Sequence, residues 1–175
     1  GKVSIMYVRW FCLVSSLLFI ALTTAANAQT IAVMTPGSNV RGTYAEILAD
    51  ELSPSFTVLD DSLVAAAYSA VRPADPFNMT SDEAKTAAAA IGCDLLVLVR
   101  TETQRRTSFE KPEYYESTAA IYVIGSRSGG LRYWTIRSSE AASPLESEAK
   151  LRAAGMTFAR EFTKVVKDSH KLDVA

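Results

Sequence analysis

The sequence predicts a single α/β domain in which helices pack on a mixed β-sheet, preceded by an export signal. Three observations predict this fold class. Short apolar runs alternate with helix-periodic stretches in the first half, three strand patterns then follow one another, and a long amphipathic stretch closes the chain. Alternating strands and helices favour parallel pairing, whereas strands joined by short turns pair antiparallel, so the sheet is expected to be mixed. The expected order is β-α-β-α-α-β-β-β-α, a sandwich within residues 29–175 that has a core at 30–168 and a C-terminal tail at 169–175.

The first half of the chain alternates strand and helix patterns. Apolar runs bounded by turn residues predict two short strands, and apolar residues at helical spacing predict the helices that follow them. Asp60 or Asp61 is placed to cap the helix after the second strand, because a carboxylate there accepts from N–H groups of the first turn. The predicted elements are strands at 31–34 and 56–59, a helix at 40–53, and a short helix that Asp60 or Asp61 caps and that runs through 65–71.

A capping box opens the third helix. In Thr80-Ser-Asp-Glu83 the threonine hydroxyl is placed to accept from the N–H of Glu83, and Gly92 is a natural left-handed end for the helix. The strand at 94–99 is continuously apolar, which indicates that both of its faces are covered. The same strand becomes polar at 101–107, so we expect it to run out past the core.

The last third predicts a hairpin and a long helix. Strands at 115–124 and 131–137 surround a turn at 126–130 whose glycines tolerate positive φ. Ser143-Pro-Leu-Glu146 is a second capping box, and the helix it opens is expected to end near residue 167. The sole histidine, His170, then falls in a solvated tail. On the last strand, either Trp134 and Ile136 or Tyr133 and Thr135 face the core, and the pattern leaves both arrangements open.

Residues 1–28 are typical of a cleavable signal peptide. A basic start is followed by a largely apolar stretch of 13 residues, Trp10 to Leu22, which as a helix would be about 20 Å long, shorter than a bilayer core of about 30 Å. Ala26-Asn-Ala28 is a small-x-small cleavage site, so cleavage is expected between Ala28 and Gln29. The sequence therefore predicts a periplasmic or secreted protein with no membrane span after cleavage.

Composition excludes several functions. With 18 basic and 19 acidic residues the chain has no cationic excess, so it is not expected to bind nucleic acid. One histidine and, after cleavage, one cysteine leave little for metal or nucleophile chemistry, and neither a cofactor nor a metal is expected. Cys93 lies between Gly92 and an apolar strand, where a buried, unreactive thiol is expected.

The loop at 37–42, Gly-Ser-Asn-Val-Arg-Gly, follows a strand and precedes a helix. N–H groups at such a place can hold a phosphate, but the loop lacks the Lys-Ser/Thr of a P-loop and the dinucleotide spacing of glycines. A plain turn is favoured. Binding of a small anion by Arg41 remains an alternative. This loop is therefore the basis of the second hypothesis, in which the protein is a periplasmic small-ligand binder or hydrolase.

Cations and aromatic residues gather where one long strand passes to the next. This mixture is enriched at binding surfaces, although a solvated hairpin tip would have the same composition. An extended polar strand also offers unpaired backbone groups to which a partner can add a strand. The candidate contact residues are Arg105, Arg106, Phe109, Tyr114 and Tyr115.

Three motifs carry a resemblance to known proteins. They are Ile31-Ala-Val-Met, Ile91-Gly-Cys-Asp-Leu-Leu-Val-Leu and Ala120-Ile-Tyr-Val-Ile-Gly-Ser-Arg-Ser-Gly-Gly-Leu-Arg-Tyr-Trp. On these motifs the chain resembles the TolB amino-terminal and CsgG-like envelope modules over about residues 30–168. Through Ile91-Gly-Cys-Asp, Arg105-Arg-Thr-Ser-Phe and Tyr114-Tyr-Glu-Ser it is also similar to periplasmic domains that precede TonB-type C-terminal domains. The resemblance implies a non-catalytic envelope module that recognises proteins, with no catalytic residue to carry over. We therefore expect an exported, non-enzymatic domain that binds a cell-envelope protein.

Overall fold

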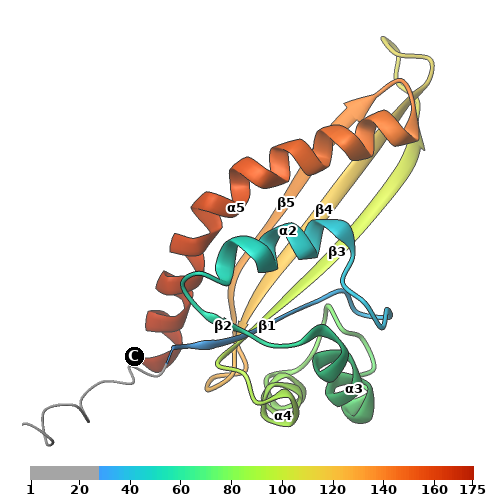
Figure 1. Ribbon diagram of the computed structural model, residues 1–175. Coiled ribbons are helices and arrows are strands. Elements are labelled where there is room, and N and C mark those ends of the chain that lie inside the picture. Colours follow the sequence, from blue (N-terminus) through green and yellow to red (C-terminus); the bar gives the residue numbers. More distant parts are fainter. Residues whose placement is uncertain (1–27) are drawn as a thin grey trace, which may run out of the picture.

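A five-stranded mixed sheet with helices on both faces organises the protein, as the computed structural model of residues 28–175 shows (Figure 1). The sheet order is β2-β1-β3-β4-β5. β1 pairs in parallel with β2 and β3, whereas β3, β4 and β5 form an antiparallel meander, so the predicted element order and the mixed sheet are confirmed. The elements are β1 Thr30–Met34, α2 Thr43–Leu52, β2 Thr57–Val58, α3 Asp61–Val71, α4 Ser81–Ile91, β3 Leu95–Arg106, β4 Tyr114–Gly125, β5 Leu131–Ala141 and α5 Pro144–Val174.

Two apolar clusters lie on opposite faces of the sheet. On one face, α2 and α5 cover strand residues such as Val97 and Ile121, and Phe162 of α5 is completely buried among them. On the other face, the shorter helices α3 and α4 cover Leu96 and Leu98. β3 is therefore covered on both faces at 95–99, as its continuously apolar sequence predicted.

The predicted helix ends of α3 and α4 are confirmed. Asp60 caps α3, accepting from the N–H groups of Ser62 and Leu63. The Thr80 hydroxyl accepts from the N–H of Glu83, and the Glu83 carboxylate accepts from the N–H of Thr80 at 2.8 Å. Both ends of the capping box are thus present.

The C-terminal tail predicted for 169–175 is wrong. Helix α5 continues to Val174, and His170 is a half-buried residue within it. Ser169 and Asp173 are buried, so the last turns belong to the folded structure. Within the described residues 28–175, no helix combines the length and apolar character needed to cross a bilayer.

Asp173 fastens the end of α5 to the β4–β5 turn. Its carboxylate accepts from the N–H of Arg127 at 2.9 Å, from the Ser128 hydroxyl at 2.5 Å and from the Arg132 guanidinium at 3.1 Å. A Cβ on Gly125 would overlap this carboxylate, so glycine is required there. These long-range bonds satisfy a buried charge, and this is why the helix does not end near residue 167.

The second predicted capping box forms only in part. The Ser143 hydroxyl accepts from the N–H of Glu146 at 3.3 Å, with Pro144 at the first helical position. The Glu146 carboxylate does not return the bond and instead pairs with Lys150, at 3.1 Å, one turn along the helix. An exposed i,i+4 ion pair thus replaces the reciprocal bond.

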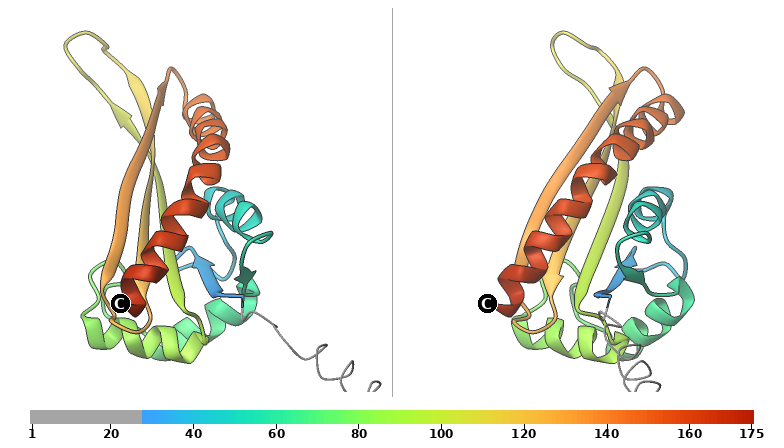
Figure 2. Two further views of the ribbon diagram at one scale, coloured as in Figure 1. Left: turned by 90° about the vertical axis from the view of Figure 1, so that its left-hand side faces the viewer. Right: turned by 60° about the vertical axis from the view of Figure 1, so that its left-hand side comes forward.

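One face of β5 is packed against α5, whereas the opposite face is largely exposed to solvent. Tyr133 packs against Phe162 of α5 with ring centroids 6.4 Å apart, which settles the alternative that the sequence left open. Trp134 and Ile136 point to the opposite face and are 59% and 55% exposed. Helices α3 and α4 cover only the lower end of that face, and the longer part of the meander extends beyond them (Figure 2).

We expect Asp173→Asn to lower the free energy of unfolding by about 2–4 kcal/mol at pH 7. Burial alone would raise the pKa of Asp173, but hydrogen bonds from Ser128, Arg127 and Arg132 outweigh it and hold the pKa below its usual value. The carboxylate therefore stabilises the fold above the unfolded-state pKa of about 3.9, and this contribution is lost as the pH falls through the lower folded-state pKa.

Urea unfolding at several pH values measures this effect. The difference between Asp173→Asn and the unsubstituted chain should shrink below about pH 4. Asp168→Asn is the matched control, because Asp168 lies on the same helix but is exposed and, within residues 28–175, pairs only with Lys171 at 3.7 Å. Equal effects of the two substitutions would contradict the role of Asp173.

Gly155→Ala should destabilise the fold by about 1–3 kcal/mol although alanine favours helices. A Cβ at Gly155 would lie 2.7 Å from Cε2 of the buried Tyr44, where α5 crosses α2. Thr157→Ala, at an exposed position of the same helix, should leave the free energy of unfolding within about 0.5 kcal/mol. Denaturant midpoints of the two variants provide the comparison.

Candidate functional site

The structure brings the five candidate contact residues together at the tip of the β3–β4 hairpin. Arg105 is directly opposite Tyr115, Arg106 is directly opposite Tyr114, and Phe109 lies in the connecting loop. This hairpin tip, defined here as residues 105–115, projects beyond the rest of the molecule in every view (Figures 1 and 2). Strand alternation places Arg105 and Tyr115 on the α5 face and Arg106 and Tyr114 on the other.

Phe109 is fully exposed at the outermost turn. The turn itself is held by reciprocal bonds between Ser108 and Lys111: the N–H of Ser108 donates to the Lys111 carbonyl at 2.8 Å, and the Ser108 hydroxyl accepts from the N–H of Lys111 at 3.0 Å. Removing a phenylalanine ring from water stabilises a protein or complex by about 2–3 kcal/mol. No other described residue covers the Phe109 ring, so this free energy is available for binding a partner.

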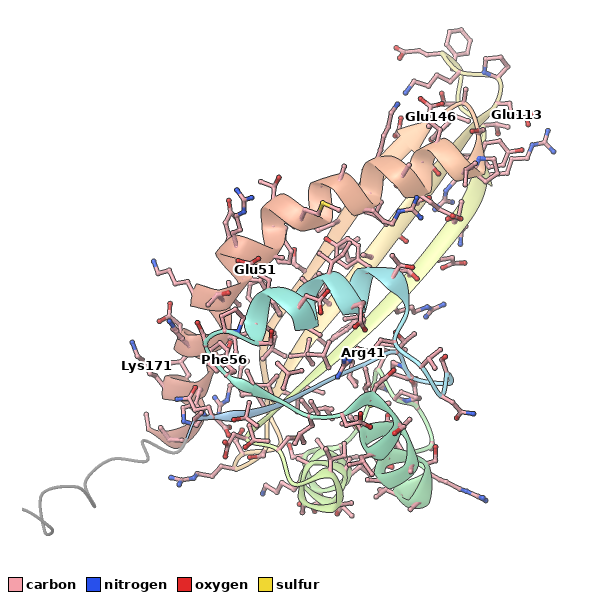
Figure 3. All side chains as sticks on the ribbon, viewed as in Figure 1. Arg41, Glu51, Phe56, Glu113, Glu146 and Lys171 are labelled. Carbon is pink, nitrogen blue, oxygen red and sulfur yellow. The ribbon has the colours of Figure 1, made fainter. Side chains whose placement is uncertain are left out.

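The cations of the tip are compensated by carboxylates that the sequence analysis did not assign. Arg105 donates to Glu113 at 2.8 Å, and Arg106 donates to Glu116 at 3.0 Å. Figure 3 shows Glu113 at this far end of the hairpin. The tip therefore presents aromatic groups beside arginines that are paired with glutamates, and its role as a contact surface stays a prediction.

Lys111 joins the tip to the end of β5. Its ammonium donates to Glu140 at 2.6 Å, and it lies 5.2 Å from the centroid of the Tyr114 ring. The hydrogen bond from Lys111 to Glu140 raises the pKa of the lysine. The tip is thus held to the neighbouring strand β5.

A polar network fixes the base of the hairpin to α5. The hydroxyls of Ser117 and Ser147, both buried, are 2.6 Å apart, and Thr103 is 2.8 Å from Ser117 and donates to Glu148 at 3.1 Å. Because α5 packs on the core, this network ties the orientation of the hairpin to the rest of the domain.

A cavity of about 310 Å³ lies beside this network, between β3, the first turn of α2 and α5. Tyr44 contributes a buried wall, and burial raises the pKa of its phenol. No sequence pattern indicates this cavity, because its walls come from four separate segments, in α2, β3, β4 and α5. The residues that line it include Thr43, Tyr44, Thr101, Thr103, Glu148, Leu151 and Arg152.

The 37–42 loop is a structural turn in which Arg41 is already occupied. The guanidinium donates to the carbonyl of Val33 at 2.7 Å and to that of Leu59 at 2.6 Å, so it bridges the ends of β1 and β2. Asp61 accepts from the N–H of Arg41 at 2.6 Å. Figure 3 shows Arg41 beneath α2, inside the molecule.

The surroundings of that loop are acidic. The depression beside Arg41 is lined by Glu46, Asp50, Asp60 and Asp61. Hydrogen bonds from Ser62 and Leu63 lower the pKa of Asp60, which acts as a helix cap. Four carboxylates around one internally bonded arginine disfavour an anion, and the described residues contain no group of three or more His, Cys, Asp or Glu side chains arranged to hold a metal.

No protein-family model matches the chain. No curated protein matches it. Among solved structures, it is similar to the hypothetical protein CT253 from Chlamydia trachomatis, with 10% identity, 77% of this chain and 98% of that chain covered, and a TM-score of 0.46. The lipoprotein GNA1162 from Neisseria meningitidis has 12% identity, 78% and 99% coverage, and a TM-score of 0.44. The LpoB C-terminal domain from Salmonella enterica has 15% identity, 70% and 90% coverage, and a TM-score of 0.38.

These similarities assign neither a family nor an activity to the chain. The resemblance to TolB amino-terminal and CsgG-like modules therefore stays a prediction, as does the cleavage site between Ala28 and Gln29. Residues 1–27 of the predicted signal peptide lie outside the described residues 28–175.

Cys93 should resist alkylation in the native protein. Burial, together with the nearby Asp94 carboxylate, raises the pKa of this thiol to about 12, so almost no thiolate is present at pH 8. We expect iodoacetamide to modify Cys93 at least a hundred times faster in urea than in buffer, as followed by mass spectrometry of the peptide that contains it. Rapid labelling of the folded chain would contradict the packing of this residue.

Proposed function

We propose that this protein is an exported, non-catalytic module of the cell envelope that binds another envelope protein through its hairpin tip. The observation that carries the proposal is the position of Phe109, a fully exposed aromatic ring at the end of a hairpin whose two arginines are each paired with a glutamate. Binding hot spots in protein interfaces commonly consist of an aromatic side chain surrounded by polar residues.

The paired charges favour a protein partner over an anionic polymer or membrane surface. Arg105, Arg106 and Lys111 each have a carboxylate within 3.0 Å, so the tip has little net positive charge to attract phosphate groups. Electroneutral aromatic surfaces instead gain affinity by excluding water against a complementary apolar surface. The signal-like segment at 1–28 supports a location in the periplasm or beyond, with a mature chain that starts at Gln29.

The alternative of a small-ligand binder or hydrolase at the 37–42 loop has less support. Arg41, the group that would hold an anion, donates its side-chain hydrogen bonds to two backbone carbonyls. We therefore assign the loop a structural role.

The proposal is tested by combining Arg105→Ala, Phe109→Ala and Tyr115→Ala in one variant. All three side chains are exposed or half-exposed, and the ion pair lost with Arg105 is worth less than about 1 kcal/mol at a surface. We expect the melting temperature to change by less than about 3 °C. Chemical crosslinking of the tagged full chain in its native envelope should then lose a specific partner that the unsubstituted chain retains.

Leu63→Ala is the matched control, because Leu63 is an apolar residue, 70% exposed, on α3 far from the hairpin tip. It should retain the partner. Retention of the same partner by the triple variant would exclude the hairpin tip as the binding surface. Loss of the partner by both variants would show that the effect is not specific to the tip.

A further inference from the structure

One side of β3 is open along its outer half. β1 pairs with β3 only as far as Met34, opposite Leu98, whereas β4 pairs with β3 as far as Arg106. β1 ends there because Pro36 has no N–H for a ladder and Gly37 turns the chain at φ 84°. Among the described residues no strand lies beside Val99–Arg106 on the side away from β4, as Figure 1 shows.

The hydrogen-bond pattern identifies the backbone groups on this open edge. Gly125 donates its N–H toward β5, to the carbonyl of Gly130 at 3.0 Å, so Gly125 and its partner Leu95 are not a hydrogen-bonded pair of the β3–β4 ladder. Alternation along β3 then directs the N–H and C=O groups of every second residue away from β4. Beyond β1 these residues are Val99, Thr101, Thr103 and Arg105.

The open edge spans about 20 Å and is bordered by the 310 Å³ cavity. The side chains of the same four residues point to the α5 face, where Thr101 and Thr103 line this cavity with Glu148 and Leu151. A strand lying 4.8 Å from β3 would thus direct alternate side chains toward a space bounded by α2 and α5.

Charges along the edge are already paired within the chain. Arg100 lies 3.7 Å from Glu102, and Arg105 and Arg106 bind Glu113 and Glu116. A charged segment would find the arginines of β3 already paired with glutamates, whereas an uncharged one would gain main-chain hydrogen bonds in full.

From these observations we infer that the Val99–Arg106 edge accepts an extended, uncharged segment of a partner protein as an added strand. The inference rests on the proposed function and specifies its binding mode. The main chain of the segment pairs with alternate residues of β3, and Phe109, at the end of the same strand pair, contacts the partner beyond that segment. Main-chain pairing supplies affinity, and the cavity beside Tyr44 selects the side chains that fit.

The test places a photo-crosslinking phenylalanine analogue at position 101, 109 or 63 of the full chain in cells. Thr101 is exposed, forms no side-chain hydrogen bond to another described residue and lies on the open edge, so it tolerates the probe. We expect positions 101 and 109 to link to the same protein, and the links from position 101 to fall within one segment of a few consecutive residues. Position 63 should give neither product.

Each other outcome is decisive. Links to the partner from position 109 but not from position 101 would overturn strand addition and leave binding by the hairpin tip intact. Links from position 101 to a second copy of this chain would replace the partner segment with self-association. Links no stronger at 101 and 109 than at 63 would overturn both the inference and the proposed function.

Thr101→Pro separates main-chain pairing from side-chain contact. Proline removes the N–H of residue 101, which points away from β4, so the β3–β4 ladder keeps its bonds and the edge position tolerates the ring. We expect the crosslink from position 109 to fall at least tenfold with Thr101→Pro and by a clearly smaller factor with Thr101→Ala, which changes the cavity lining but keeps the N–H. Equal losses would overturn strand addition. If Thr101→Pro fails to fold, as judged by its melting transition, the position-101 links decide alone.

Discussion

Helix α5 holds the long meander in place because it is fixed to the sheet along its whole length. At its start, the buried pair Ser147 and Ser117 joins it to the base of the hairpin. In its middle, Phe162 is completely buried against the sheet, and Asp173 binds the β4–β5 turn at its end. A three-stranded meander with no helix packed along it would be only marginally stable, and its strands could bend relative to the rest of the sheet. The hairpin tip is therefore presented by a braced strand pair, even though its outermost turn touches little else.

The sequence was informative wherever structure depends on near neighbours. The Thr80 capping box, the Asp60 cap and the turn at 126–130 are local features, and each forms as predicted. The predicted tail failed because the bonds that retain the last turns of α5 join Asp173 to residues 41 to 46 positions earlier. A helical pattern cannot reveal that a carboxylate in its weakly apolar last turns will meet a turn in another part of the chain.

The candidate site follows the same rule. Cations interleaved with aromatic residues marked the hairpin tip correctly as one cluster, but their neutralising carboxylates depend on strand register, and Glu140 is 29 residues from Lys111. The open edge of β3 was harder still to predict from the sequence. It exists only because β1, a five-residue strand, is paired with the start of β3, a twelve-residue strand. Both lengths can be approximated from the sequence, whereas their relative alignment is a property of the folded sheet.

Trp134 makes the intrinsic fluorescence of the chain from Gln29 onward specific to one face of the sheet. Of the two tryptophans, Trp10 lies within the predicted signal peptide, so a chain that begins at Gln29 has a single indole. That indole is 59% exposed on the sheet face opposite α5, away from the cavity beside Tyr44. Its emission thus reports on that face: a molecule that covers the meander there would shift the spectrum to shorter wavelength, whereas one seated on the opposite face would leave it unchanged. Intrinsic fluorescence can therefore distinguish the two sides of the sheet without any label.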